Sequence, residues 1–60
     1  MQFLDRTVLV TGGAGGLGRG ICLVMAERGA DVAVVDFNLD GAEKVAAEVA
    51  RTGRRARAFK

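Results

Sequence analysis

No histidine, one cysteine and no long run of apolar side chains occur among the 60 residues of the sequence. The single cysteine, Cys22, excludes an internal disulfide, and without histidine it cannot build a structural zinc site. Half of the residues are hydrophobic, which argues against disorder. Their runs are much shorter than the roughly 20 apolar residues of a membrane span. We therefore predict no metal site, no membrane partner and a reducing, cytoplasmic setting, with Cys22 buried as a small apolar side chain.

The N-terminal segment Met1–Arg6 has no basic flank followed by an apolar block, so it predicts no secretory signal. A chain of 60 residues buries only about 60% of the surface that it exposes when unfolded. We therefore expect marginal stability for these residues on their own.

Charge is unevenly distributed along the chain. Residues 1–50 carry a net charge of −3 and the last ten residues carry +5, which gives the total of +2. The cations of this basic tail are Arg51, Arg54, Arg55, Arg57 and Lys60. A basic cluster can mark a nucleic-acid interface, but only one aromatic residue accompanies it, and cations are favoured at a helix end. We predict a solvated helix end and loop, with no nucleic-acid partner.

Short apolar runs alternate with helical patterns in the first half of the sequence. Thr7–Val10 and Val32–Val35 are rich in β-branched residues, which is typical of parallel strands buried on both faces. Between them, apolar residues recur at helical spacing from Leu17 until a left-handed stop at Gly29. The apolar face predicted for this helix consists of Leu17, Ile21, Val24, Met25 and the stem of Arg28.

A second helical pattern follows a loop at residues 37–39. Asp40 is the predicted N-cap, with Glu43 completing a capping box, and Gly53 is the predicted stop. The buried face predicted for this helix consists of Ala42, Val45, Ala46 and Val49. Lys44 and Glu48 are predicted to pair on the exposed side. Residues 55–60 alternate basic with apolar side chains and predict the approach to a third strand, which the chain ends before completing.

The predicted order is thus β-α-β-α and the start of β. A parallel crossover is right-handed and places its helix on one face of the sheet, whereas a parallel sheet needs cover on both faces. We predict an α/β fold in which residues 1–60 form the first, incomplete part of a single larger domain with a doubly wound parallel sheet.

The glycines between the first strand and the first helix predict a binding site for phosphate. The first turn of a helix offers free N–H groups and the positive end of the helix dipole. Gly12 would make the tight turn after the strand, Gly16 would let the backbone approach the pyrophosphate, and Gly18 would allow close packing of helix and strand. Asp36 ends the second strand 20 residues after Gly16, where a carboxylate accepts hydrogen bonds from ribose hydroxyls. Together these features predict a dinucleotide site.

The pattern Thr11-Gly12-x-x-x-Gly16-x-Gly18, within L-V-T-G-G-A-G-G-L-G-R-G, resembles the cofactor motif of the short-chain dehydrogenase/reductase family. The later stretch V-A-V-V-D-F-N is also similar to that family. The resemblance covers nearly all 60 residues, which correspond to about the first quarter of a typical member. It implies a Rossmann-like fold and, in the full-length protein, hydride transfer between a nicotinamide cofactor and an alcohol or carbonyl substrate.

The resemblance also implies a role for each motif residue. Gly12, Gly16 and Gly18 match the three motif glycines, and the Thr11 hydroxyl would tie the turn together. Leu17 would offer its backbone N–H to the pyrophosphate. The predicted cofactor-binding residues are Thr11, Gly12, Gly15, Gly16, Leu17, Gly18, Asp36, which holds the adenosine ribose, and Phe37, which lies beside the adenine or packs elsewhere.

Charge predicts NAD over NADP, because Asp36 would repel a 2′-phosphate. Relatives that prefer NADP often carry a basic residue just before the middle glycine or just after the second strand. Those positions are Gly15 and Phe37 here. Arg19 is the nearby cation and is predicted to be an exposed helix residue.

Catalytic residues are not expected among these 60 residues. The family uses a tyrosine, a lysine four residues later and a serine, and the sequence contains no tyrosine and no serine. The full-length protein is expected to supply them, to bind the small-molecule substrate and to form a homo-oligomer. Two alternatives remain open: a non-catalytic nucleotide-binding module or truncated chain, and the N-terminus of an S-adenosylmethionine-dependent methyltransferase, which also uses a glycine turn and an acid after its second strand.

Overall fold

Three parallel strands and two helices alternate along the chain in the computed structural model, which describes residues 3–60. The elements are β1 (Thr7–Thr11), α1 (Gly16–Glu27), β2 (Asp31–Val35), α2 (Leu39–Ala50) and β3 (Ala56–Phe59). The order confirms the predicted Rossmann-like α/β arrangement. The prediction for the end of the chain is corrected, because β3 is a formed strand. The prediction for Met1–Arg6 lies partly outside the described residues.

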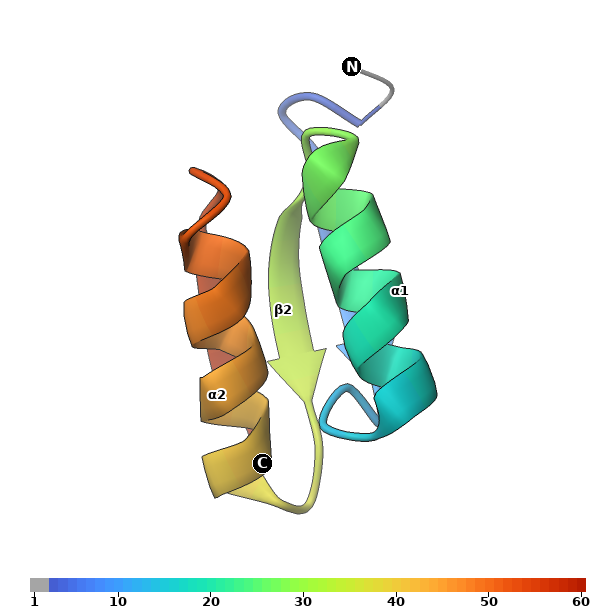
Figure 1. Ribbon diagram of the computed structural model, residues 1–60, viewed down its shortest axis with the longest axis vertical. Helices are drawn as coiled ribbons and strands as arrows, with labels where there is room; N and C mark the ends of the chain where they lie inside the picture. Colours follow the sequence, from blue (N-terminus) through green and yellow to red (C-terminus); the bar gives the residue numbers. More distant parts are fainter. Residues whose placement is uncertain (1–2) are drawn as a thin grey trace.

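The sheet has the order β1-β2-β3, with β2 in the centre and parallel to both neighbours. Thr7 pairs with Asp31 at one end of the first ladder, and Val35 pairs with Phe59 at the end of the second. Both helices lie on the same face of the sheet, in front of β2 in Figure 1. Two right-handed crossovers that proceed in the same direction produce this arrangement. The carboxyl ends of the strands therefore meet at one edge, next to the turn before α1.

The core lies between the helices and one face of the sheet. Val10, Val32 and Val34 point to this side and are buried, together with Cys22, which is fully buried as predicted. Burial raises the pKa of the Cys22 thiol. On the other face, Leu9 is 65% exposed and Phe59 is 47% exposed. Within the described residues the strands are therefore buried on one face, and burial on both faces stays a prediction for the larger domain.

Helix α1 does not bury the apolar side chains that the sequence predicted would face the sheet. Leu17, Ile21 and Val24 are exposed, and the buried residues are Gly18, Cys22 and Ala26. Small side chains face the sheet because they let the helix approach the strands closely, and the turn before α1 needs that approach. Larger side chains are left on the outer side of the helix. The spacing of large apolar residues predicted the helix correctly but not which side faces the sheet.

Helix α2 has the predicted buried face, made of Ala42, Val45, Ala46 and Val49. Its N-cap differs from the prediction. Asn38 is the N-cap, and its side-chain Oδ1 accepts a hydrogen bond from the Gly41 backbone N–H at 3.1 Å. Asp40 instead lies in the first turn of the helix, where its negative charge suits the helix dipole. The helix therefore begins at Leu39, two residues earlier than an N-cap at Asp40 would allow.

Both helices end in the predicted way. Gly29 and Gly53 adopt left-handed backbone conformations, with φ of +95° and +93°, which residues with a Cβ rarely adopt. The Gly29 N–H donates to the Ala26 carbonyl at 3.0 Å, which satisfies an acceptor at the end of α1. Each helix has 12 residues, and within residues 3–60 neither meets the length and apolarity of a membrane-crossing segment.

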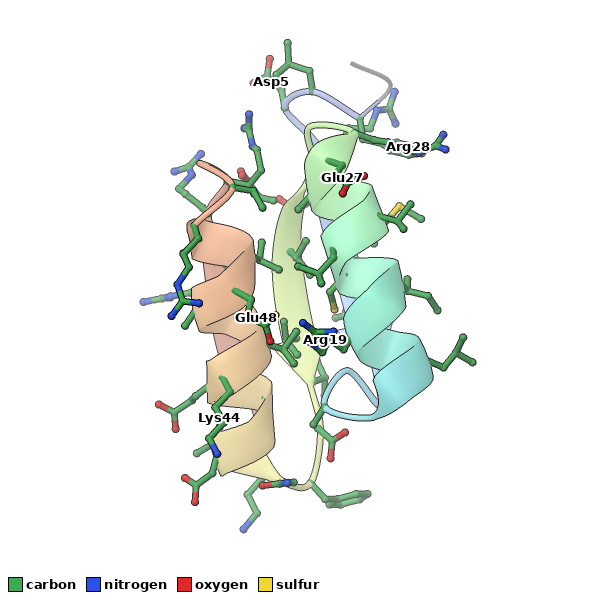
Figure 2. All side chains as sticks on the ribbon, in the orientation of Figure 1. Asp5, Arg19, Glu27, Arg28, Lys44 and Glu48 are labelled. Carbon is green, nitrogen blue, oxygen red and sulfur yellow. The ribbon has the colours of Figure 1, made fainter. Side chains whose placement is uncertain are left out.

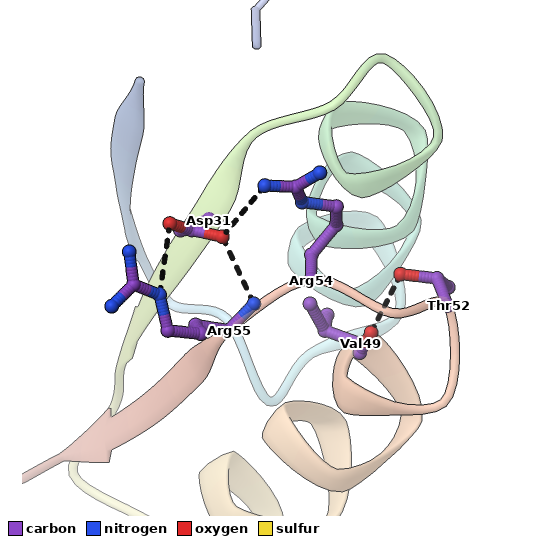
Figure 3. Close-up of polar contacts among 5 residues, drawn as sticks. All are labelled: Asp31, Val49, Thr52, Arg54 and Arg55. Atoms are coloured by element: carbon purple, nitrogen blue, oxygen red, sulfur yellow. Dashed lines mark hydrogen bonds and ion pairs between the residues drawn. The ribbon is translucent and has the colours of Figure 1, made fainter. Parts of the chain in front are cut away.

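Asp31, at the start of β2, forms a hydrogen bond and ion pairs with residues just before β3 (Figure 3). Its Oδ1 accepts the Arg55 backbone N–H at 2.9 Å and lies 3.4 Å from Arg54 Nη2, while Oδ2 lies 3.5 Å from Arg55 Nε. The backbone hydrogen bond from Arg55 and the two guanidinium charges lower the pKa of the Asp31 carboxyl. Part of the basic tail is thus tied to an acid, which corrects the prediction of a purely solvated loop.

Arg19 of α1 and Glu48 of α2 point toward each other between the two helices (Figure 2). Arg19 Nε donates to both carboxylate oxygens of Glu48, at 2.9 and 3.1 Å, and its Nη2 also donates to Oε2. This contact lowers the pKa of Glu48 and raises that of Arg19. Glu48 therefore pairs with a residue 29 positions away, which corrects the predicted pairing with Lys44.

Candidate functional site

The glycine turn leaves β1 through a left-handed residue. Gly12 has φ of +68°, which explains why glycine follows Thr11 at the end of the strand. The Gly15 N–H then donates to the Gly12 carbonyl at 3.2 Å and closes the turn. The Gly13 N–H donates to the Val35 carbonyl at 3.1 Å, which connects the turn to the end of β2. Thr11 is exposed at the last position of β1, and the role of its hydroxyl stays a prediction.

The N-terminus of α1 carries no side-chain cap. Its N-cap is Gly15, and its first turn contains no acidic residue. In α2, by contrast, Asn38 caps the first turn and Asp40 provides a negative charge there. The first N–H groups of a helix have no partner within the helix. In α1 these groups are left to an external acceptor, at the positive end of the helix dipole.

Two motif glycines have opposite surroundings. A Cβ on Gly18 would lie 2.1 Å from the Gly12 carbonyl oxygen, so α1 packs directly on the backbone of the turn. The predicted close approach at Gly18 is therefore observed, but the nearest atoms belong to Gly12 and Gly13 of the turn and not to the strand. A Cβ on Gly16 would meet nothing within 4 Å. Nothing in the described chain requires glycine at position 16, which leaves that space for a ligand.

The prediction from the sequence missed a structural glycine in the turn. Gly13 is buried, and a Cβ there would lie 2.5 Å from Val34 Cγ1. Its N–H also bonds to Val35. A second adjacent glycine in the motif was the available signal, but only the packing of the turn against β2 shows its purpose.

A pocket of about 440 Å³ opens beside the turn, at the carboxyl ends of the strands. It is lined by Thr11, Gly12, Val35, Asp36, Phe37 and Lys60. Asp36 lies at its edge directly after β2, and the Phe37 side chain is 93% exposed. The structure thus brings the predicted residues Thr11, Asp36 and Phe37 together around one cavity. Gly16 and Leu17 do not line this cavity. They line a separate one along α1, with Gly20, Ile21, Val24 and Met25, and Leu17 is 82% exposed.

Val35 and Lys60 line the pocket although the sequence did not identify them as site residues, and Lys60 is the charged one. Val35 pairs with Phe59, and the Asp36 N–H donates to the Phe59 carbonyl at 3.0 Å, so positions 36 and 60 are neighbours after the ends of β2 and β3. The pocket is therefore lined by one acidic and one basic side chain. The alternation of residues 55–60 predicted a strand, but the register with β2 was needed to place the lysine.

The model of the short chain dehydrogenase family matches residues 6–60. The chain belongs to this family. Like other short-chain dehydrogenases, it carries the glycine turn between its first strand and first helix, and the family assignment confirms the resemblance drawn from that motif.

Individual relatives support the same assignment. The chain is 37% identical over 59 residues to a cyclohexanol dehydrogenase of an Acinetobacter species, covering 98% of this chain and 24% of the relative. It resembles the crystal structure of an NAD⁺-bound xylitol dehydrogenase with a TM-score of 0.94 and 36% identity, covering 98% of this chain and 23% of that protein. A hydroxysteroid dehydrogenase from Escherichia coli gives a TM-score of 0.88 at 33% identity, covering 95% and 24%. The chain thus spans about a quarter of the length of these relatives.

Proposed function

We propose that this short-chain dehydrogenase chain binds NAD, and that the full-length protein transfers a hydride between the nicotinamide and an alcohol or carbonyl substrate. The observation that carries the proposal is the uncapped N-terminus of α1, next to a pocket that Asp36 lines. The pyrophosphate would accept hydrogen bonds from the first N–H groups of α1, at Gly16 and Leu17. The ribose hydroxyls would donate to Asp36, and the adenine would lie beside Phe37.

The space around Gly16 supports this arrangement. Apart from its chain neighbours and the backbone of its own helix, no atom lies within 4 Å of a Cβ at position 16, so the ligand would contact the backbone without displacing a side chain. The free N–H groups and the helix dipole favour an anion at the same place. Bound NAD would supply the hydride acceptor, and these residues would hold and orient it.

Cofactor preference depends on two opposite charges in the pocket. Asp36 would repel a 2′-phosphate and accept hydrogen bonds from the free hydroxyls of NAD. Lys60 lines the same pocket and is the feature that favours NADP as the second candidate. We propose NAD because the Asp36 carboxylate directly follows β2, the position at which an acid contacts the ribose.

Catalysis and substrate binding are assigned to the remainder of the full-length protein, because these 60 residues contain no tyrosine and no serine. We propose that residues 1–60 are the first part of a larger dinucleotide-binding domain, which is supported by the open sheet face and the share of the relatives that they span. A cytoplasmic homo-oligomer without nucleic-acid or membrane partners remains part of this proposal. The fully buried thiol of Cys22 fits a reducing setting.

Calorimetric titration of the full-length protein with NAD, NADP and S-adenosylmethionine tests the proposal. NAD is expected to bind most tightly. Tighter binding of S-adenosylmethionine would replace the proposal with the methyltransferase alternative, and binding of NAD without any dehydrogenase activity on alcohols would favour the non-catalytic module.

Asp36→Ala is expected to weaken NAD binding by about 10- to 100-fold, the effect of losing a hydrogen bond to a charged group, and to reduce the preference over NADP. An unchanged preference would remove Asp36 from the cofactor site.

Gly16→Val is expected to abolish dinucleotide binding while the protein keeps its melting temperature, because the new side chain would fill the ligand space and meet no part of the described chain. Gly20→Val is the matched control, since a Cβ on Gly20 also meets nothing within 4 Å and the helix is the same. Retained NAD affinity in Gly16→Val would show that the turn does not hold the pyrophosphate.

A further inference from the structure

Asp36 connects the glycine turn to the start of α2. Its Oδ2 accepts the backbone N–H of Ala14 at 3.1 Å, and its Oδ1 accepts the backbone N–H of Asn38 at 2.9 Å. Asn38 Oδ1 in turn accepts the Gly41 N–H at 3.1 Å. One carboxylate therefore links the middle of the turn with a loop 22 residues later in the sequence.

Gly41 brings the same two segments into direct contact. A Cβ on Gly41 would lie 2.9 Å from the Ala14 Cβ and 2.8 Å from Asn38 Nδ2. The first turn of α2 thus packs against the middle of the glycine turn, and a side chain at position 41 would push them apart. Gly41 does not line the pocket, so its contact acts on the turn and not on a ligand there.

The turn has few other connections to the sheet. In the described part of the chain, residues 12–15 bond to the end of β2 through the Gly13 N–H and through the Ala14 N–H on Asp36. Three of these four residues are glycines, which lose the most conformational freedom when they are ordered. The bond to Asp36 is therefore one of the two hydrogen bonds that hold the turn to the end of β2, beside the packing of Gly13 on Val34 and of Gly18 on Gly12.

We propose that Asp36 is a positioning residue of the phosphate turn, acting with Asn38 and Gly41, in addition to its contact with the ribose. This inference rests on the proposed dinucleotide function. With Ala14 held by the carboxylate, the backbone N–H groups that follow at Gly16 and Leu17 keep their direction. Asp36 then contributes to phosphate binding even when the ligand has no ribose hydroxyl to offer.

ADP and 2′,3′-dideoxy-ADP separate the two roles. Both ligands carry adenine and a pyrophosphate, but the second has no ribose hydroxyl that could donate a hydrogen bond to Asp36. Affinities of the full-length protein for both are measured by competition with NAD. Loss of the contact between Asp36 and the ribose hydroxyls lowers only the affinity for ADP. A turn that is no longer held in position lowers the affinity for both ligands.

Asp36→Ala and Asp36→Asn form a matched pair, because both remove the negative charge but asparagine keeps one acceptor oxygen. For 2′,3′-dideoxy-ADP, we expect alanine to weaken binding about fivefold to tenfold, as for loss of one or two backbone hydrogen bonds, and asparagine to restore most of the affinity. Equal affinities of the wild type and both variants for this ligand would overturn the proposal.

Gly41→Ala gives an independent test that leaves Asp36 in place. We expect weaker NAD binding, and Gly41→Ala combined with Ala14→Gly to recover part of the affinity, because the second change removes the Ala14 Cβ but leaves the contact with the Asn38 side chain. Melting temperatures of all variants show whether the fold is kept. A Gly41→Ala variant that binds NAD like the wild type would contradict the proposed positioning of the turn by Asp36, Asn38 and Gly41.

The two proposals fail in different ways. If the wild-type protein binds neither NAD nor ADP, the proposed function itself is wrong. If it binds both ligands, and Asp36→Ala weakens only ADP while 2′,3′-dideoxy-ADP is unaffected, the function stands and the positioning role of Asp36 is refuted.

Discussion

At the scale of single residues, the glycines of the turn and of α1 are not interchangeable. Gly12 is required by its left-handed φ of +68°, and Gly13 and Gly18 by the absence of space for a Cβ. Gly16 and Gly20 have open space around them. The first three therefore maintain the fold, and Gly16 is the one whose exchange is expected to affect a ligand alone.

Gly18→Ala is expected to destabilise the full-length protein by about 1–3 kcal/mol, the cost of forcing an extra methyl group into a packed site. Gly20→Ala is the matched control in the same helix and is expected to stabilise it by about 0.5–1 kcal/mol through helix propensity. Chemical denaturation measures both. A Gly18→Ala variant as stable as Gly20→Ala would show that α1 does not rest on the turn as described.

The lowered pKa of the Asp31 carboxyl predicts that the free energy of unfolding decreases at acid pH. Its folded-state pKa is lowered by the Arg55 N–H and by two guanidinium groups, so its stabilising contribution is complete above the ordinary aspartate pKa of about 4. That contribution is lost as the pH falls through the lowered value. Melting temperatures between pH 7 and pH 2 should therefore decline less steeply in Asp31→Asn than in the wild type. Glu43→Gln, at an exposed position of α2, is the control and should follow the wild-type curve; identical curves for all three proteins would contradict the role of Asp31.

At the scale of elements, the two helices begin in different ways. A side chain caps the first turn of α2, whereas the first turn of α1 has no side-chain cap. The N-terminus of α2 is capped by Asn38, whereas that of α1 begins at Gly15 without a cap. The salt bridge between Arg19 and Glu48 joins the helices and keeps the Arg19 guanidinium on Glu48. Arg19 is thereby paired, and the proposed anion site at the start of α1 depends on its backbone N–H groups.

Asn38→Ala is expected to lower the free energy of unfolding by about 1 kcal/mol, the usual effect of removing an N-cap side chain. Asn38→Ser should retain most of the stability, since serine also caps helices well. Asp40→Ala is expected to cost less, because Asp40 interacts with the helix dipole only. If Asp40→Ala proves the more costly change, the cap was assigned to the wrong residue.

At the scale of the whole molecule, the sheet is covered on one face by α1 and α2 and open on the other. Leu9 and Phe59 are exposed on the open face, and Leu17, Ile21 and Val24 on the outer side of α1. A parallel sheet is ordinarily covered on both faces. The short-chain dehydrogenase relatives are about four times as long as this chain, which is consistent with further structure that covers these surfaces in the full-length protein.

Residues 1–60 expressed alone are expected to be marginally stable, because so short a chain buries too small a fraction of its surface. A broad thermal transition, self-association in analytical ultracentrifugation and binding of a hydrophobic dye are the expected results. A monomeric segment with a sharp transition at the melting temperature of the full-length protein would contradict this expectation.

The order of the elements, both helix stops, the buried face of α2 and the position of the glycine turn could be predicted from the sequence alone. These features depend on local chemistry: the left-handed conformations of Gly29 and Gly53, the helical spacing of Ala42, Val45 and Val49, and the glycines after β1. The family resemblance rested on the same local motif. Each could be predicted because neighbours in the sequence are enough to produce it.

Only the tertiary structure decided the rest. Small residues, and not the large ones, face the sheet in α1 because Gly18 must rest on the turn. Glu48 pairs with Arg19 and Asp31 with Arg54 and Arg55 because the packing of helices and strands brings distant charges together. Asp36 reaches Ala14, and Lys60 enters its pocket, through the parallel register of β1, β2 and β3. Contacts between residues far apart in the chain depend on register and packing, and spacing along the sequence does not specify them.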